Sequence, residues 1–148
     1  MPDHPTDPAC IFCKIVAGQI PSFKVYEDDV IFAFLDIGPL VPGHTLVVPK
    51  AHYATVMTTP PEVLAAVNAR LPALSRAVLA AVGAEACHVL VNNGASAMQT
   101  VPHLHYHVIP RQEDDGFSIP WKTHPLDKAQ APALAAAIVS RLGNIKQP

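Results

Sequence analysis

The feature that most constrains the fold is a row of histidines at every second position, His103, His105 and His107, in the segment VPHLHYHVIPR. In an extended strand, residues two apart lie on one side, about 6 to 7 Å from each other. In a helix, only His103 and His107 would share a face. Two prolines bracket the row and β-branched residues follow it, which favours a strand. We therefore expect the three imidazoles on one side of a strand and apolar side chains on the other.

A surface that faces only solvent would normally carry lysine, glutamate or threonine rather than three histidines. Two chemical interpretations of the row remain open from the residues alone. One is a metal site built on the His-x-His spacing, because neutral imidazole is a common metal ligand. The other is nucleophilic catalysis, because neutral imidazole is also a good nucleophile near pH 7.

The composition is that of a globular protein with one core. The chain has 148 residues, of which 50% are hydrophobic and 15% charged, with a net charge of −2. This charge argues against binding to bulk nucleic acid. The N-terminus MPDHPTDPAC lacks the features of a signal peptide, and no uninterrupted apolar run approaches the ~20 residues of a membrane span. We expect a cytoplasmic protein with a flexible tail at residues 1–9 and a single domain at 10–148.

The chain alternates strand-like and helix-like segments. Strand-forming residues occur twice within 23–37 and again at 44–50, 87–91 and 103–111. Apolar residues recur at helical spacing over 60–83, where Pro72 should kink or split the helix. A second helix is expected within 128–144, with a late start at Pro132. The prediction is an α+β fold with a mostly antiparallel five-stranded sheet, one long helix and a C-terminal helix.

The row and its surroundings resemble the histidine triad (HIT) superfamily of nucleotide hydrolases and transferases. HLHYHVI is similar to its signature of three alternating histidines. CIFCKIVAGQIPSFKVYEDD, AFLDIGPLVPGHTLVVPKAH and NNGASAMQTVPHLHYHVIPR resemble, in this order, the N-terminal, central and active-site segments of bacterial HIT proteins. DGFSIPWKTH resembles the tail of a bacterial subgroup. The likeness covers nearly the whole chain.

The resemblance implies a catalytic role for the middle histidine. His105 would attack the α-phosphate of a purine nucleotide and form a covalent nucleotidyl intermediate, which water then hydrolyses. Its other ring nitrogen should donate to a backbone carbonyl near His103. His107 would donate to the phosphate or the leaving group, and His44 would support the triad.

The loop before the triad carries further expected contacts. Gln99 and Thr100 match a family pair that contacts phosphate and leaving group, and Asn92 matches an asparagine with a similar role. Plain turn or loop residues are the alternative for Asn92 and Gln99. One departure is Met98, because the family usually has glycine there, which lets the backbone approach a phosphate.

The resemblance also implies a nucleoside pocket. Asp36 would accept hydrogen bonds from the ribose hydroxyls, and its place between apolar residues makes a purely structural role costly. An apolar slot suits a flat base. The residues implied around the base are Ile11, Phe12, Ile15, Phe34, Leu35 and Ile37. For Ile15 and Phe34, a place in the core is the alternative.

Cys10 and Cys13 form a C-x-x-C motif, which commonly supplies two ligands to zinc. In the zinc-bearing HIT subgroup the other two ligands correspond to His52 and His103. Four protein ligands would make this zinc structural. Two reduced cysteines beside a helix, with His52 on the surface, are the alternative.

The expected enzyme is therefore a HIT-type hydrolase of nucleoside phosphoramidates or dinucleoside polyphosphates, and the family implies a homodimer. Two other functions stay open. One is a nucleotide-binding regulatory protein with little turnover, which Met98 would favour. The other is a metal-dependent hydrolase that uses the histidine row as ligands.

Overall fold

The structure is a computed structural model that describes residues 3–143 and 145. Residues 1, 2, 144 and 146–148, which belong to the predicted tail and C-terminal segment, lie outside the described part. The chain divides into two compact units, Met1–Phe117 and Ser118–Pro148, which we describe separately.

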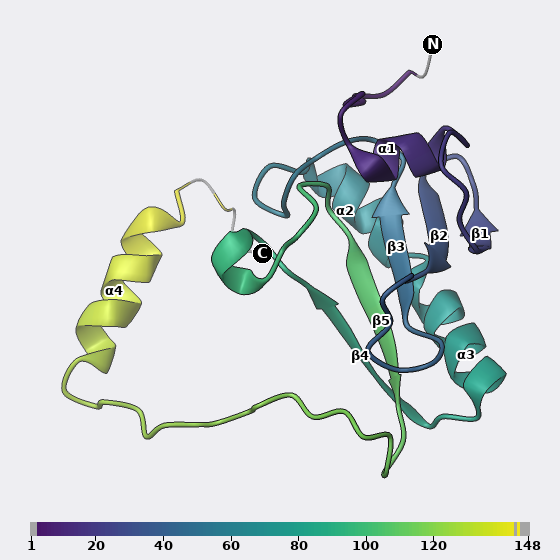
Figure 1. The fold of residues 1–148 in the computed structure, drawn as a ribbon. Coiled ribbons are helices and arrows are strands. Elements are labelled where there is room, and N and C mark those ends of the chain that lie inside the picture. Colours follow the sequence, from purple (N-terminus) through teal and green to yellow (C-terminus); the bar gives the residue numbers. More distant parts are fainter. Residues whose placement is uncertain (1–2, 144, 146–148) are drawn as a thin grey trace. The chain divides into compact units, whose positions relative to one another are not determined.

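The first unit is built on one five-stranded sheet with the strand order β1-β2-β3-β5-β4 (Figure 1). Every neighbouring pair is antiparallel. The predicted α+β class with an antiparallel sheet is thus confirmed. The strands are β1 (Lys24–Glu27), β2 (Ile31–Leu35), β3 (Thr45–Pro49), β4 (Ala86–Val91) and β5 (Tyr106–Arg111).

The strand that carries the histidine row is shorter than predicted. β5 begins at Tyr106, so only His107 lies within it, and the expectation of all three histidines on a strand was wrong. The reason is a change of partner: Tyr106 pairs with β3 and β4, whereas the Leu104 N–H donates to the Tyr53 carbonyl at 2.6 Å. The alternation nevertheless persists, because Leu104 and Tyr106 are buried together in one core cluster.

One face of the sheet is covered by α2 (Pro61–Asn68) and α3 (Leu71–Val82). Pro72 lies in the first turn of α3, so the predicted long helix is split rather than kinked. Gly83 ends α3 with a φ of 67°, which suits glycine. The core between helices and sheet contains the buried residues Ile31, Ala33, Val47, Val67, Leu71, Leu74, Val78, Leu104, Tyr106 and Val108.

The helical stretch Pro61–Val82 is long and apolar enough to cross a membrane by length and composition alone. The core helix of a soluble protein passes the same test. Val67, Leu71, Leu74 and Val78 of this stretch are buried in the core cluster, and 22% of its most apolar window is buried.

The other face of the sheet is covered by the six-residue helix α1 (Ile11–Val16). Its Phe12, Cys13 and Ile15 pack with residues of β2 and β3, namely Phe32, Phe34, Leu46 and Val48. These strand residues alternate with those that face α2 and α3, as the two-residue period of a strand requires. A short helix leaves part of this face uncovered, and the candidate site lies there.

The second unit contains α4 (Ala131–Arg141), with Pro132 in its first turn. The helix begins where the sequence predicted a late start. Its Leu134, Ile138 and Val139 are exposed.

Candidate active site

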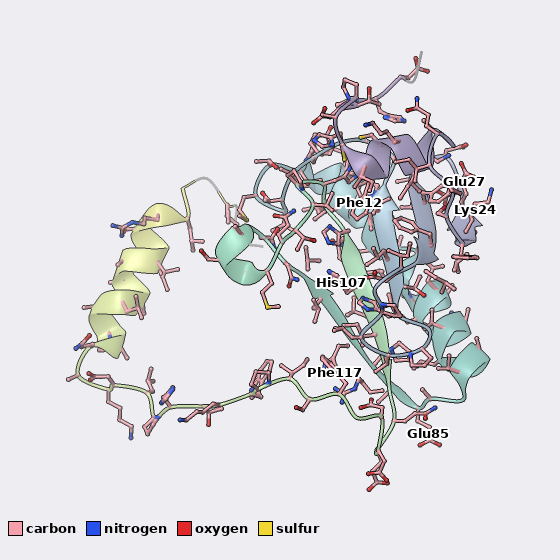
Figure 2. All side chains as sticks on the ribbon, viewed as in Figure 1. Phe12, Lys24, Glu27, Glu85, His107 and Phe117 are labelled. Atoms are coloured by element: carbon pink, nitrogen blue, oxygen red, sulfur yellow. The ribbon has the colours of Figure 1, made fainter. Side chains whose placement is uncertain are left out.

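A cavity of about 510 Å³ lies beside α1 and β5. Phe12 on α1 and His107 on β5, both labelled in Figure 2, line it together with His105. All seven residues predicted for the nucleoside pocket are among its lining: Ile11, Phe12, Ile15, Phe34, Leu35, Asp36 and Ile37. The structure therefore brings the predicted apolar slot and two of the histidines to one place.

The sequence prediction missed several lining residues: Ile20, Pro21, Ser22, Phe23, Leu46 and Val101. Leu46 was open to prediction, because it alternates with Val47 and so shares a face with Val48 in the predicted strand. The segment 20–23 has no periodic pattern that ties it to the site. Its position depends on tertiary contacts, such as the hydrogen bond from the Leu35 N–H to the Phe23 carbonyl at 3.0 Å.

His105 presents an unprotonated nitrogen toward the cavity. Its Nδ1 lies 2.7 Å from the backbone carbonyl of His103. A carbonyl oxygen only accepts, so Nδ1 carries the proton and Nε2 keeps its lone pair in the neutral ring. Phe12 holds the ring edge-on, with the ring centroids 5.1 Å apart. The predicted orientation of the His105 ring, including its carbonyl partner, agrees with this geometry.

His107 presents a hydrogen-bond donor, whereas His105 presents an acceptor nitrogen. The Leu40 N–H donates to His44 Nδ1 at 3.1 Å, so the neutral His44 ring carries its proton on Nε2. That N–H donates to His107 Nδ1 at 2.8 Å, which leaves the His107 proton on Nε2. Among the described residues, His107 Nε2 is a buried side-chain atom with no hydrogen-bond partner. A buried donor without a partner is costly, so this N–H is suited to a ligand oxygen.

Burial sets the charge of these rings. It lowers the pKa of His107 to about 4, with help from the neighbouring His105 and His44. Burial also lowers the pKa of His105, against the raising effects of the His103 carbonyl and Asp36. The pKa of His44 is lowered by burial as well, although Asp36 opposes this. All three imidazoles are therefore neutral at pH 7, and the lone pair of His105 is available.

Asp36 lies at the end of β2, with 20% of its side chain exposed. One carboxylate oxygen accepts from the Gly38 N–H at 2.8 Å, and the other lies 3.6 Å from His44 Nε2. The carboxylate thus borders both the cavity and the histidine pair, and it retains acceptor capacity for a ligand.

The loop before the triad is held by its own polar groups. The Gln99 side chain accepts from the Gly94 N–H at 2.7 Å and donates to the Ala54 carbonyl at 2.6 Å. Thr100 lines the cavity, whereas Gln99 and Asn92 do not. The side-chain oxygen of the neighbouring Asn93 accepts a hydrogen bond from the Val56 N–H at 2.9 Å, which fixes the loop. Phosphate contacts by Gln99 and Asn92 remain predictions.

Met98 adopts a left-handed conformation with a φ of 67°, the one non-glycine residue with positive φ in the described part of the chain. Its side chain is 79% exposed. The usual glycine at this position therefore suits the backbone conformation of the loop, and Met98 adopts it at the cost of strain.

A second cluster unites the four predicted zinc ligands. His103 Nδ1 lies 3.5 Å from Cys10 Sγ, 3.6 Å from Cys13 Sγ and 3.2 Å from His52 Nδ1. Cys13 Sγ is 3.4 Å from His52 Nδ1. Zinc bonds of about 2.0–2.3 Å in a tetrahedron imply ligand separations of roughly 3.3–3.8 Å. The donor set and its spacing thus fit a structural zinc ion.

The His103 ring also has an outer partner, since its Nε2 lies 2.9 Å from the Pro49 carbonyl. Such a bond orients a metal-ligating imidazole. His103 therefore links the two clusters, because its ring belongs to the cysteine group while its carbonyl holds His105. The three alternating histidines do not converge on one metal position.

Comparison with known proteins shows a match to the HIT domain over residues 17–114. The chain is 48% identical over 106 residues to "Adenylylsulfatase HINT3" of Arabidopsis thaliana, covering 72% of this chain and 54% of that protein. It is 42% identical over 135 residues to "Adenosine 5'-monophosphoramidase hnt1" of Schizosaccharomyces pombe, covering 90% and 98%. The expectation of a HIT-type hydrolase agrees with these names.

Solved structures give the same result. A member of the HIT family from Bacillus subtilis has a TM-score of 0.84 at 42% identity, covering 90% of this chain and 97% of that chain. A zinc-bound histidine triad family protein from Mycobacterium smegmatis has a TM-score of 0.71 at 37% identity, covering 89% and 94%. The family match, the fold and the paired polarity of His105 and His107 lead to one conclusion: this chain belongs to the HIT family.

Proposed function

We propose that the protein hydrolyses a purine nucleotide conjugate at its α-phosphate, through a covalent nucleotidyl intermediate on His105. One observation carries the proposal: adjacent rings, with centroids 4.8 Å apart, present a lone pair on His105 and an N–H on His107 at the same cavity. The names of the relatives, an adenylylsulfatase and an adenosine 5′-monophosphoramidase, support a nucleotide conjugate as substrate.

In the first step His105 Nε2 attacks phosphorus, the bond to the leaving group breaks, and the leaving group takes the electron pair together with a proton from solvent. The N–H of His107 donates a hydrogen bond to a phosphate oxygen or to the leaving atom, where negative charge develops. Water then attacks phosphorus, the bond to Nε2 breaks, and a proton passes to solvent as the nucleoside monophosphate leaves. One difficult displacement is thereby divided into two easier ones.

The base would occupy the apolar part of the cavity, between α1 and β2, and the ribose hydroxyls would donate to Asp36. The apolar lining supports a flat ring there. Thr100 lines the same cavity, and we propose that it and Gln99 contact the phosphate or leaving group. The Cys10, Cys13, His52 and His103 cluster would hold zinc, which would supply structural cross-linking of the N-terminal segment to the triad.

A homodimer is part of this proposal. β4 is an edge strand of the sheet, and its Val89 is 44% exposed. A six-residue edge strand invites pairing with another strand. Light scattering coupled to gel filtration should give twice the chain mass in solution.

We also expect a cytoplasmic location, in keeping with three free cysteines.

The decisive experiment is intact mass spectrometry after rapid quenching with adenosine 5′-monophosphoramidate. We expect a nucleotidyl adduct on the wild-type chain and steady release of AMP. The variant His105→Ala should lose both, with kcat/KM falling by about 10³-fold or more. His88→Ala, which changes a histidine of β4 outside the cavity lining, is the matched control. Tight AMP binding without an adduct or turnover would instead favour the regulatory function.

A further inference from the structure

A second group of possible metal ligands lies beside the nucleophile and apart from the cysteine cluster. It consists of Asp36, His44 and His107, whose ligand atoms all lie within 4.8 Å of one another. His44 Nε2 is 2.8 Å from His107 Nδ1 and 3.6 Å from Asp36 Oδ2. Asp36 directly follows β2, His44 directly precedes β3, and His107 is the second residue of β5, so the pairing of these strands brings the three residues together.

The donor set suits a divalent transition-metal ion. Two imidazole nitrogens and one carboxylate oxygen are ligands that Zn²⁺ accepts, and three protein ligands leave one position open. His44 is 3% exposed, and the side chain of Asp36 is 20% exposed. His44 Nε2 and His107 Nδ1 must move apart by roughly half an ångström to match the distance between two ligands of a tetrahedral zinc ion. Three strands of one sheet restrict the ligands, while the cavity gives the ion a path of entry.

We propose that Asp36, His44 and His107 form a second, inhibitory site for a divalent transition-metal ion, distinct from the Cys10, Cys13, His52 and His103 cluster. The inhibition rests on the function proposed above, because it depends on nucleotide binding at Asp36. The binding of the ion does not depend on that function.

The hydrogen-bond pattern explains why ion and nucleotide exclude each other. Coordination requires a lone pair on His44 Nε2, so the proton of that ring moves to Nδ1 through solvent. The Leu40 N–H then loses its acceptor, and the hydrogen bond that the His44 Nε2–H donates to His107 Nδ1 is lost. The ion also takes the Asp36 carboxylate, which the ribose would otherwise use. The hydrogen bond between His44 and His107 is therefore expected in the nucleotide-bound state. In the inhibited state both residues coordinate the ion instead.

The two metal sites differ in chemistry, which allows them to be observed separately. The cysteine cluster offers two thiolates, whereas the second site offers only nitrogen and oxygen. Cobalt bound to thiolates gives an intense near-ultraviolet charge-transfer band, and cobalt bound to nitrogen and oxygen alone does not. The thiolate site also favours zinc more strongly, so it fills first.

The test is metal stoichiometry of the full chain by equilibrium dialysis with Zn²⁺, repeated with Co²⁺ and absorption spectroscopy. We expect two equivalents on the wild type, of which only the first gives the thiolate band. Asp36→Asn should weaken the second equivalent by at least about tenfold and leave the first unchanged. Asp29→Asn, which changes an exposed aspartate of the β1–β2 turn, is the control and should bind both equivalents of zinc. Cys13→Ser should lose the thiolate-type equivalent and keep the other.

The effect on nucleotide binding is measured by calorimetric titration with AMP at one and at two equivalents of Zn²⁺. We expect the affinity for AMP to fall at least about tenfold when the second site is filled, and excess AMP to displace only that second ion. A single equivalent on the wild type, or a second equivalent that Asp36→Asn retains, overturns the site. A second equivalent that leaves the AMP affinity unchanged overturns the inhibition. If AMP does not bind at all, the proposed function fails while the stoichiometry still decides the site.

Discussion

The two faces of the sheet are covered by very different amounts of helix. On one face, α2 and α3 bury a continuous apolar cluster that contains residues of β2, β3 and β5. On the other face, the six-residue α1 covers only part of the strands and leaves a cavity of about 510 Å³ beside the histidines. The same alternating strands thus supply a packed core on one side and a ligand cavity on the other. In this sheet the cavity lies on the face that carries the shorter helix.

The largest effect on stability is expected on the packed face. Leu74→Ala removes a buried side chain from α3 and should lower the free energy of unfolding by about 2–5 kcal/mol. The folded fraction should keep its kcat/KM, because Leu74 lies in the cluster between helices and sheet. Denaturant unfolding and steady-state kinetics check both statements.

Ile11→Ala is the matched change on the open face, since Ile11 is 46% exposed and lines the cavity. It should change stability by less than about 1 kcal/mol and raise KM for the nucleotide substrate. Equal losses of stability in the two variants would contradict the comparison of the faces.

The next effect concerns the zinc cluster on the open face. Bound zinc adds about 2.7 kcal/mol of stability when its free concentration is 100 times Kd. Cys13→Ser should lose most of this gain together with the thiolate-bound equivalent of zinc, whereas Cys87→Ser should retain both. Atomic absorption and melting curves with and without zinc provide the measurement. A Cys13→Ser protein that gains as much stability from zinc as the wild type would show that the cysteine cluster does not hold the stabilising ion.

A smaller effect is expected where the packed face meets the β1–β2 turn. Asp28 accepts from Arg70 Nε at 2.6 Å and from the N–H groups of Val30 and Ile31. Although partial burial opposes the shift, these donors lower the pKa of Asp28 to about 2. The pKa in the unfolded chain is near ~3.9, so this stabilisation is complete above about pH 4 and is lost as the pH falls toward 2.

Asp28→Asn should therefore reduce the loss of stability between pH 4 and pH 2 by about 1–2 kcal/mol relative to the wild type. Unfolding by urea at pH 4, 3 and 2 measures this difference. Asp29→Asn is the control for the loss of one carboxylate in the same turn. Parallel pH profiles for Asp28→Asn and the wild type would contradict the assigned role.

The smallest effect is expected at Met98. Glycine tolerates its φ of 67° without strain, although it also increases the entropy of the unfolded chain. Met98→Gly should therefore raise the free energy of unfolding by up to about 1 kcal/mol. Ala97→Gly, at a neighbouring position where φ is not positive, should lower it by a similar amount. Differential scanning calorimetry compares the two, and destabilisation by both would exclude strain at Met98.

Much of the fold and of the candidate site could be predicted from local sequence patterns. The strand-forming segments, the helix split at Pro72 and the apolar slot of Ile11, Phe12 and Phe34 all follow from residue spacing and family resemblance. The strand containing the histidines was predicted too long, because its first residues bond to Tyr53 rather than to a neighbouring strand. Segment 20–23 was missed, because an irregular loop leaves no periodic signal.

The sequence by itself determined the α+β class, the alternation that separates Leu104 and Tyr106 from the histidines, and the candidate zinc ligands. Only the tertiary structure decided which nitrogens of His44 and His107 carry the proton, and that these two rings and Asp36 meet beside His105. The physical reason is one of range. Backbone periodicity acts over a few residues, whereas hydrogen-bond partners 63 residues apart, such as His44 and His107, are chosen when the strands pair.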